Sequence, residues 1–152
     1  MVKPPFLVQS ARCALVGLAL ASGAAFAIEY RSVETATVLY DAPSVRGKPL
    51  FVIKRYTPVE PVVSLEGWTK VRDAEGGLAW IEKKHLSEQR TVLVTARQAQ
   101  VRREASDDAA VVFEAEKSVA LELIEAGISG WAKVKHRDGQ TGFVRANQVW
   151  GL

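Results

Sequence analysis

The feature that most constrains this chain is an internal repeat at a constant offset of 63 residues. Residues 67–71, Gly-Trp-Thr-Lys-Val, align with residues 130–134, Gly-Trp-Ala-Lys-Val, without a gap. Further matches at this offset are Gly76 with Gly139, Trp80 with Phe143, and Val38 with Val101. Such a repeat indicates two copies of one small folding unit, each about 60 residues long.

The first 27 residues have the order of a secretory signal peptide. Lys3 and Arg12 give a basic start, and the apolar run 13–24 follows them. Residues 25–27, Ala-Phe-Ala, are typical of a cleavage site. A membrane anchor is the alternative, but the run is shorter than the roughly 20 apolar residues that cross a bilayer. We therefore expect removal of residues 1–27, a periplasmic or secreted protein, and no stable membrane anchor after cleavage.

Removal of this segment changes the composition that matters for function. The formal net charge falls from +3 to +1, because the segment carries two basic residues and no acid. A near-neutral chain offers no electrostatic reason to bind nucleic acid. The only cysteine, Cys13, is lost as well, so the mature chain forms no disulfide. Units of about 60 residues are marginal alone, and we expect them to pack on each other or to share a strand.

Short apolar runs separated by turn signals predict an all-β fold. The expected strands are 36–40, 50–54, 59–65, 68–72 and 78–81 in the first copy, and 100–102, 111–113, 119–125, 131–135 and 141–144 in the second. Residues 83–86 are expected to form a 3₁₀ turn. The β-prone run 91–95 lies between the copies, and we expect it to close the first sheet. The predicted units are therefore 28–95 and 96–152.

The repeated pattern resembles the bacterial SH3-like domain family. It consists of Gly-Trp-x-Lys-Val, a glycine turn and an aromatic–aliphatic pair, and the second copy matches more closely through 101–102, 130–134 and 138–144. The resemblance covers roughly residues 36–151. It implies two small SH3-like β-barrels in tandem, each of five strands. Members of this family often bind cell-wall peptides or act as accessory modules of wall hydrolases.

Strand alternation predicts an aromatic surface on each copy. Successive side chains of a strand point to opposite faces, so Trp68 and Trp80 point away from the core of the first copy. Trp131 and Phe143 take the same place in the second copy. Uncovered aromatic side chains at this density favour a binding surface. The alternative is that the long loop of each copy, or the other copy, covers them.

Comparison with the eukaryotic SH3 pattern adds candidates in the first copy. Tyr40 and Trp68 match two aromatic residues of the peptide groove in that family. Glu82 stands where the groove proline is expected, and His85 stands where a second tyrosine is expected. The resemblance therefore implies a groove of mixed aromatic and charged character, which suits a charged peptide better than polyproline.

The same positions differ in the second copy. Arg103, Trp131, Arg145 and Gln148 occupy them, so only the tryptophan is shared. Any difference in function between the copies is expected at these positions. The predicted ligand-binding residues are Tyr40, Trp68, Trp80, Glu82, Arg103, Trp131, Phe143 and Arg145.

The mature sequence contains no catalytic pattern. It has two histidines, His85 and His136, no cysteine, and no HxxH, HExxH or CxxC spacing. No serine lies in an elbow motif. We therefore expect no enzyme activity, no metal and no cofactor. The leading hypothesis is a protein that binds peptidoglycan peptide or a protein partner through its aromatic faces. The alternative is a periplasmic protein–protein adaptor or regulator without affinity for the wall. An enzymatic role remains only if a partner supplies the chemistry.

Overall fold

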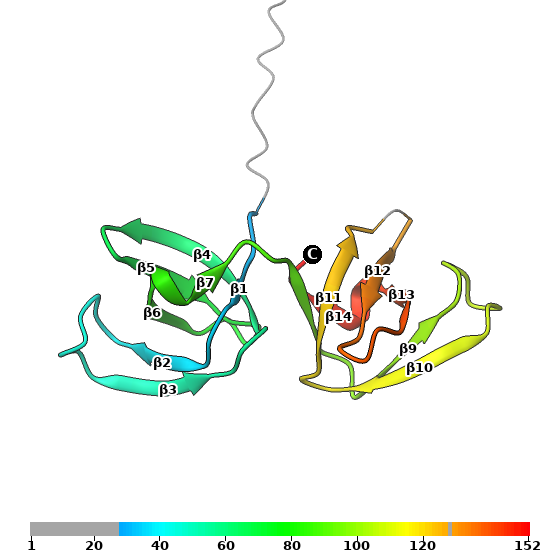
Figure 1. Cartoon of the computed structure of the whole chain (residues 1–152), viewed down its shortest axis with the longest axis horizontal. Helices are drawn as coiled ribbons and strands as arrows, with labels where there is room; N and C mark the ends of the chain where they lie inside the picture. Colours follow the sequence, from blue (N-terminus) through cyan, green and yellow to red (C-terminus); the bar gives the residue numbers. More distant parts are fainter. Residues whose placement is uncertain (1–27, 128) are drawn as a thin grey trace, which may run out of the picture.

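The computed structural model describes residues 28–127 and 129–152, and the predicted signal segment lies outside these ranges. The described residues form two antiparallel sheets of seven strands each, without an α-helix. Figure 1 shows the two sheets side by side, each curved around its own core. The predicted all-β architecture in two tandem units is confirmed. None of the described residues belongs to a helix that is long and apolar enough to span a membrane.

The first unit contains strands β1 to β7 and one short 3₁₀ helix. Their bounds are β1 Arg31–Val33, β2 Thr37–Tyr40, β3 Pro49–Ile53, β4 Pro58–Leu65, β5 Trp68–Arg72, β6 Leu78–Glu82, η1 Lys83–His85 and β7 Leu86–Ser87. The strands follow the order β3-β2-β6-β5-β4-β1-β7 in the sheet. All five expected strands and the 3₁₀ turn are present at or near their predicted positions.

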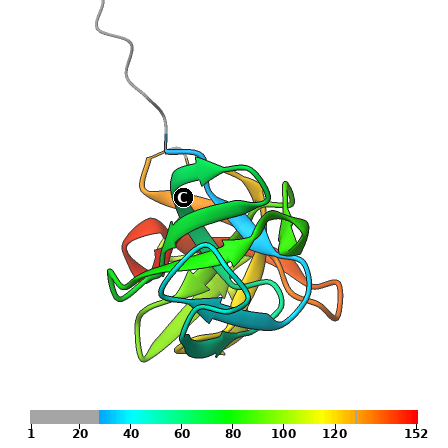
Figure 2. The same ribbon diagram turned by 90° about the vertical axis from the view of Figure 1, so that its left-hand side faces the viewer.

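The second unit repeats this topology strand for strand. Its elements are β8 Thr91–Val94, β9 Gln98–Arg102, β10 Val111–Glu116, β11 Ala120–Glu125, β12 Trp131–Lys135, β13 Thr141–Arg145, η2 Ala146–Gln148 and β14 Val149–Trp150. The order β10-β9-β13-β12-β11-β8-β14 matches that of the first sheet. The sequence repeat is therefore a repeat of the whole fold. In the view of Figure 2 the first unit lies in front of the second.

The prediction that the run 91–95 closes the first sheet is wrong. β8 pairs with β11 through Val92 and Leu121, and with β14 through Val94 and Val149. The second sheet therefore begins at Thr91, inside the range 28–95 predicted for the first unit. The sequence conceals this because the corresponding strand β1 has only three residues, one of them a buried serine, and gives no β-pattern of its own.

Alternation along the central strands separates the cores from the outer faces. In β5, Thr69 and Val71 are buried, whereas Trp68, Lys70 and Arg72 are only half-buried. The first core contains Val33, Leu39, Ile53, Val59, Val71, Ala79 and Ile81. The second core contains Val92, Val94, Ala99, Val101, Ala115, Leu121, Ala132, Val134, Val144 and Val149. Two separate cores of this size are small, which makes contact between the units important.

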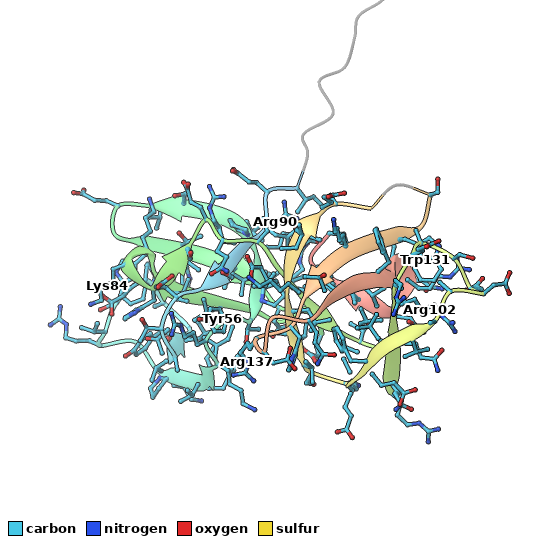
Figure 3. The ribbon with its side chains drawn as sticks, turned by 45° about the vertical axis from the view of Figure 1, so that its right-hand side comes forward. Tyr56, Lys84, Arg90, Arg102, Trp131 and Arg137 are labelled. Carbon is cyan, nitrogen blue, oxygen red and sulfur yellow. The ribbon has the colours of Figure 1, made fainter. Side chains whose placement is uncertain are left out.

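The two units pack against each other around Arg90, as expected for marginal small domains. The Arg90 guanidinium donates a 2.9 Å hydrogen bond to the carbonyl of Gly151 and lies 5.6 Å from the Tyr30 ring centre. Tyr30 packs edge-to-face on Trp150 with ring centres 5.0 Å apart. Burial raises the pKa of the Tyr30 phenol, and the nearby Glu60 adds to this effect. Figure 3 shows Arg90 between the two units. Trp150 thus both pairs in the second sheet and contacts the first unit.

Replacement of Arg90 by alanine should weaken the junction. The change removes a hydrogen bond from a charged donor and a cation–π contact, so we expect a loss of about 2 kcal/mol in the free energy of unfolding. Urea denaturation followed by circular dichroism measures this loss. Arg97→Ala is the matched control, because Arg97 is an exposed arginine of the second unit. Equal stability of the two variants would contradict the proposed role of Arg90.

The turn between β12 and β13 is held by Asp138. Its carboxylate accepts hydrogen bonds from the backbone N–H of Gln140 at 2.9 Å and from the Gln140 side-chain amide at 2.7 Å. These bonds, the backbone one first, lower the pKa of Asp138 from 3.8 to about 2. Gly139 completes the turn with a φ of 95°, which glycine adopts without strain.

The lowered pKa gives a pH dependence with a definite sign. Because the carboxylate is favoured in the folded state, its contribution to stability is complete above about pH 4 and is lost as the pH falls through about 2. NMR titration of the Asp138 carboxyl carbon should give a midpoint near 2 in the folded protein, and Asp138→Asn should remove this contribution. A midpoint at the ordinary value of 3.8 would contradict the role of the turn.

Candidate binding site

The register of three strands gathers the aromatic side chains of the first unit. Tyr40 at the end of β2 lies opposite Trp80 of β6, and Trp68 begins β5, which pairs with β6. The Tyr40 and Trp68 rings meet edge-to-face with centres 5.7 Å apart. All three side chains are half-buried. They form one continuous surface, which we call the first aromatic surface.

Charged side chains of both signs lie beside this surface. Lys70 stands directly opposite Trp80, with its Nζ 5.9 Å from the ring centre. Glu82 stands directly opposite Trp68. The Glu82 carboxylate pairs with Lys84 Nζ at 2.7 Å, and His85 Nε2 lies 3.9 Å away. The first aromatic surface therefore has a cation at one end and a carboxylate at the other.

The second unit builds the corresponding surface from different residues. Lys133 stands opposite Phe143 and lies 5.9 Å from its ring centre, which repeats the pair formed by Lys70 and Trp80. The residue opposite Phe143 on β9 is Arg102, in the place that Tyr40 has in the first unit. The alignment of Arg103 with Tyr40 is therefore wrong by one residue.

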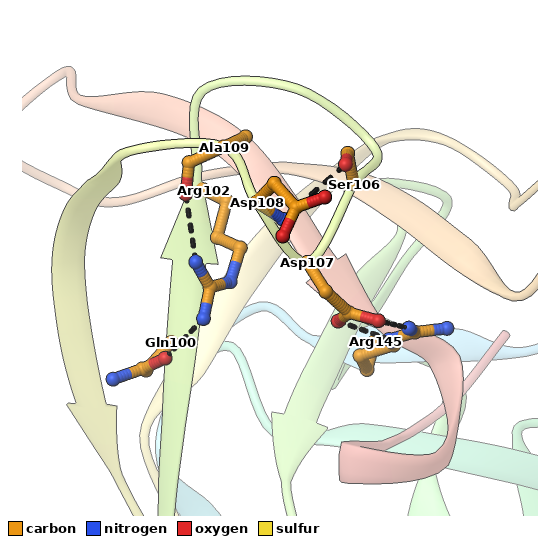
Figure 4. Close-up of polar contacts among 7 residues, drawn as sticks. All are labelled: Gln100, Arg102, Ser106, Asp107, Asp108, Ala109 and Arg145. Carbon is orange, nitrogen blue, oxygen red and sulfur yellow. Dashed lines mark hydrogen bonds and ion pairs between the residues drawn. The ribbon is translucent and has the colours of Figure 1, made fainter.

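Trp131 is covered, although its counterpart Trp68 is not. Trp131 is only 5% exposed. The Arg145 guanidinium lies 4.3 Å from the Trp131 ring centre. Asp107, in the long loop of the second unit, binds Arg145 through both carboxylate oxygens, one of them 3.1 Å from Nε. Figure 4 shows this pair and the loop that supplies Asp107. Trp131 is therefore covered by Arg145, which the long loop holds through Asp107.

The backbone at Gly127 packs closely against the backbone of Trp131. A Cβ atom at Gly127 would lie 1.8 Å from the Trp131 carbonyl oxygen, so only glycine fits there. What remains beside Trp131 and Phe143 is a hollow of about 100 Å³. Ligand pockets are typically about 300–1,000 Å³. The hollow beside Trp131 and Phe143 is therefore too small for a peptide without rearrangement.

The structure divides the predicted site residues into three groups. Tyr40, Trp68, Trp80 and Glu82 come together on the first unit, and Trp131, Phe143 and Arg145 on the second. Arg103 is exposed at the start of the long loop, where its backbone N–H donates a 2.9 Å hydrogen bond to the Ala110 carbonyl. Sequence reasoning missed Lys70, Lys133 and Asp107. The shared lysine of the Gly-Trp-x-Lys-Val motif was a visible signal for the first two.

A further hollow of about 190 Å³ lies at the junction of the two units. Tyr56, Leu121, Lys135 and Arg137 are among its lining residues, and Figure 3 shows Tyr56 and Arg137 near each other. Thr91 crosses the junction by donating a 2.8 Å hydrogen bond to the Tyr56 carbonyl. The volume is again below that of typical ligand pockets. Within the described residues, no group of three or more His, Cys, Asp or Glu side chains could hold a metal ion.

Two small curved antiparallel sheets of identical strand order define a tandem pair of small β-barrel domains. A family model described as the bacterial SH3 domain matches residues 33–88 and again residues 95–151. The chain therefore belongs to the bacterial SH3 domain family, as the sequence motif predicts. Among curated proteins, no sequence matches this chain.

Solved structures that match this chain include NlpC2 from Trichomonas vaginalis, at 15% identity and a TM-score of 0.36, over 80% of this chain and 46% of that chain. An NlpC/P60 family protein from Bacillus cereus ATCC 10987 matches at 17% identity and a TM-score of 0.37, over 80% and 55% of the two chains. NlpC1 from Trichomonas vaginalis matches at 15% identity and a TM-score of 0.35, over 85% and 48%. The chain thus spans about half the length of these solved chains.

The unequal covering of Trp68 and Trp131 can be measured in solution. We expect acrylamide to quench the fluorescence of Trp68 several-fold more strongly than that of Trp131, because Trp131 is only 5% exposed and lies beneath the Arg145 guanidinium, whereas Trp68 is half-buried. Variants that keep one tryptophan and carry phenylalanine at the other three positions isolate each signal, and circular dichroism checks their folding. Equal quenching constants would contradict the difference between the two surfaces.

Proposed function

We propose that this protein is exported and non-catalytic, and that the first aromatic surface binds a peptide of the bacterial cell wall. The observation that carries the proposal is the half-buried cluster of Tyr40, Trp68 and Trp80 on the face opposite the core. Aromatic side chains supply large contact areas at low entropic cost and dominate binding energies. Membership of the bacterial SH3 domain family and the signal-like segment 1–27 agree with this role.

The charges beside the surface suit this class of ligand. Stem peptides of the wall carry both carboxylates and amines, and the surface offers Lys70 at one end and Glu82 at the other. Opposite charges at a fixed separation orient a short peptide and set its direction. The ring faces between them accept the apolar parts of the chain.

Replacement of Trp68 by alanine tests the site. Purified peptidoglycan should retain the wild-type protein in a sedimentation assay, and Trp68→Ala should reduce the bound fraction about tenfold, as expected for loss of a central aromatic contact. The matched control is Phe51→Ala. Phe51 is 45% exposed on the edge strand β3, outside the first aromatic surface. Full retention of a folded Trp68→Ala variant would contradict the assignment, and no retention of the wild type would exclude wall binding.

An adaptor role without affinity for the wall is the second candidate, and strand β3 favours it. β3 is an edge strand of the first sheet, and Leu50, Phe51 and Val52 are 43%, 45% and 66% exposed. An exposed apolar edge is a template for an additional strand from a partner. In this case cross-linking in the periplasm should recover a protein partner that Phe51→Ala loses and Trp68→Ala retains. The two variants therefore separate the candidates.

A further inference from the structure

The two long loops have the same backbone conformation, which allows a residue-by-residue comparison of the two surfaces. In each unit the first loop N–H bonds to the last carbonyl, from Asp41 to Lys48 and from Arg103 to Ala110. Ser44 and Ser106 each accept a bond from the backbone N–H two residues later. The loops correspond at an offset of 62 residues, so Val45 takes the place of Asp107.

In the second unit, a cationic side chain of the same chain occupies the outer face of the tryptophan. The Arg145 guanidinium lies over the Trp131 ring, and Asp107 neutralises it from the loop. A guanidinium over tryptophan is a favourable cation–π arrangement. The contact shows which chemical group the tryptophan of this fold accepts on its outer face.

The first unit has a tryptophan face and a carboxylate at this position, and no cationic side chain of the described residues lies over the Trp68 ring. Glu82 takes the place of Arg145, directly opposite Trp68, and Val45 takes the place of Asp107. Val45 is 63% exposed at the tip of its loop. A tryptophan, a tyrosine and a carboxylate therefore surround a position that holds a guanidinium in the second unit.

We propose that the first aromatic surface binds a positively charged side chain of an extended peptide, a guanidinium or an ammonium group, between Trp68 and Glu82. The proposal rests on the function proposed above and names the group that is recognised. Trp68 supplies the ring face, Tyr40 fixes the ring by its edge contact, and Glu82 supplies the opposite charge. The second unit takes this group from its own chain and is closed to the peptide.

Two neighbouring side chains, Lys84 and His85, would compete with a cationic ligand for the Glu82 carboxylate. This competition provides a specific test of the proposal. Lys84 pairs with Glu82 at 2.7 Å but is 66% exposed, and exposed pairs contribute only about 0–1 kcal/mol. His85 lies 3.9 Å from the other carboxylate oxygen. A cationic ligand must displace Lys84, so removal of Lys84 should strengthen binding. A purely structural Glu82–Lys84 pair would not have this consequence.

The test uses NMR of the full mature chain and two synthetic peptides. The probes are acetyl-Gly-Arg-Gly-amide and the same peptide with citrulline, which keeps the shape of arginine without its charge. The arginine peptide should shift the indole N–H signal of Trp68 in a saturable way and leave that of Trp131 unchanged. Glu82→Gln should weaken this binding on the order of fivefold to tenfold. Citrulline should produce no saturable shift.

Substitutions at neighbouring positions complete the test. Lys84→Gln should tighten binding several-fold, whereas Lys83→Gln, its exposed neighbour, should change it little. Arg145→Ala should uncover Trp131 and leave Asp107 free, so that the arginine peptide now shifts the Trp131 signal too. Asp107→Asn in the same background should reduce that new binding. Because both side chains are partly exposed, the signal dispersion of these variants should match the wild type.

Contradictory results separate this inference from the proposed function. Equal shifts with arginine and citrulline, or tighter binding by Glu82→Gln, would overturn the cation site. If peptidoglycan retains the protein through Trp68 but the arginine peptide gives no saturable shift, the cation site is wrong and wall binding stands. If the arginine peptide binds in a Glu82-dependent way but peptidoglycan does not retain the protein, wall binding is wrong and the cation site stands.

Discussion

The antiparallel pairing of β5 with β6, and of β12 with β13, determines both the core and the outer face of each unit. The register places Val71 against Ala79 on the inner face and Lys70 against Trp80 on the outer face. A slip by one residue would exchange these faces and bury the lysine, which is why the register is so strongly specified. Gly67 precedes β5 with a φ of 73°, and Gly130 precedes β12 with a φ of 84°. The Gly-Trp-x-Lys-Val motif therefore marks the start of this hairpin in the sequence of each unit.

The hairpin and its repeat could be predicted because they depend on local signals. Alternation and glycine turns lie within the motif, and no gap separates its two copies. The short strands β1, β7 and β14 could not be predicted, because two or three residues carry no periodicity. Their place in the sheets depends on partners far along the chain, as in the pairing of Ser32 with Ser87.

The displaced alignment of Arg103 has another cause. The offset is 62 residues at the long loop and 63 at the hairpin, because five residues separate Glu125 from Trp131, whereas four separate the corresponding Val63 from Trp68.

The difference between the two outer faces arises from two substitutions on one scaffold. Arg145 and Asp107 close the second unit, and Glu82 and Val45 leave the first unit open. The closing pair is partly exposed, so screening limits it, and together with the cation–π contact it stabilises the closed face by about 1 kcal/mol. This is a small free energy, which makes closure a property of particular side chains rather than of the fold. Glu82 and Arg145 are both charged, and Val45 and Asp107 lie in loops, outside the strand alternation. For this reason the alternation of the strands alone could not distinguish the faces.

The contacts between the two units connect the difference between their outer faces to the stability of the protein. The first core holds seven buried hydrophobic residues among the described part of the chain, and the second holds ten. The smaller core gains additional packing from Pro58, which contacts the Gly151 backbone of the second unit, and from Tyr30 on Trp150. Arg90 joins these contacts because it reaches both Gly151 and Tyr30. The closed second unit, with its larger core, therefore supports the first unit, whose half-buried tryptophans Trp68 and Trp80 contribute less to its own packing. Together with the function proposed for the first aromatic surface, this difference would divide binding and stability between the two copies.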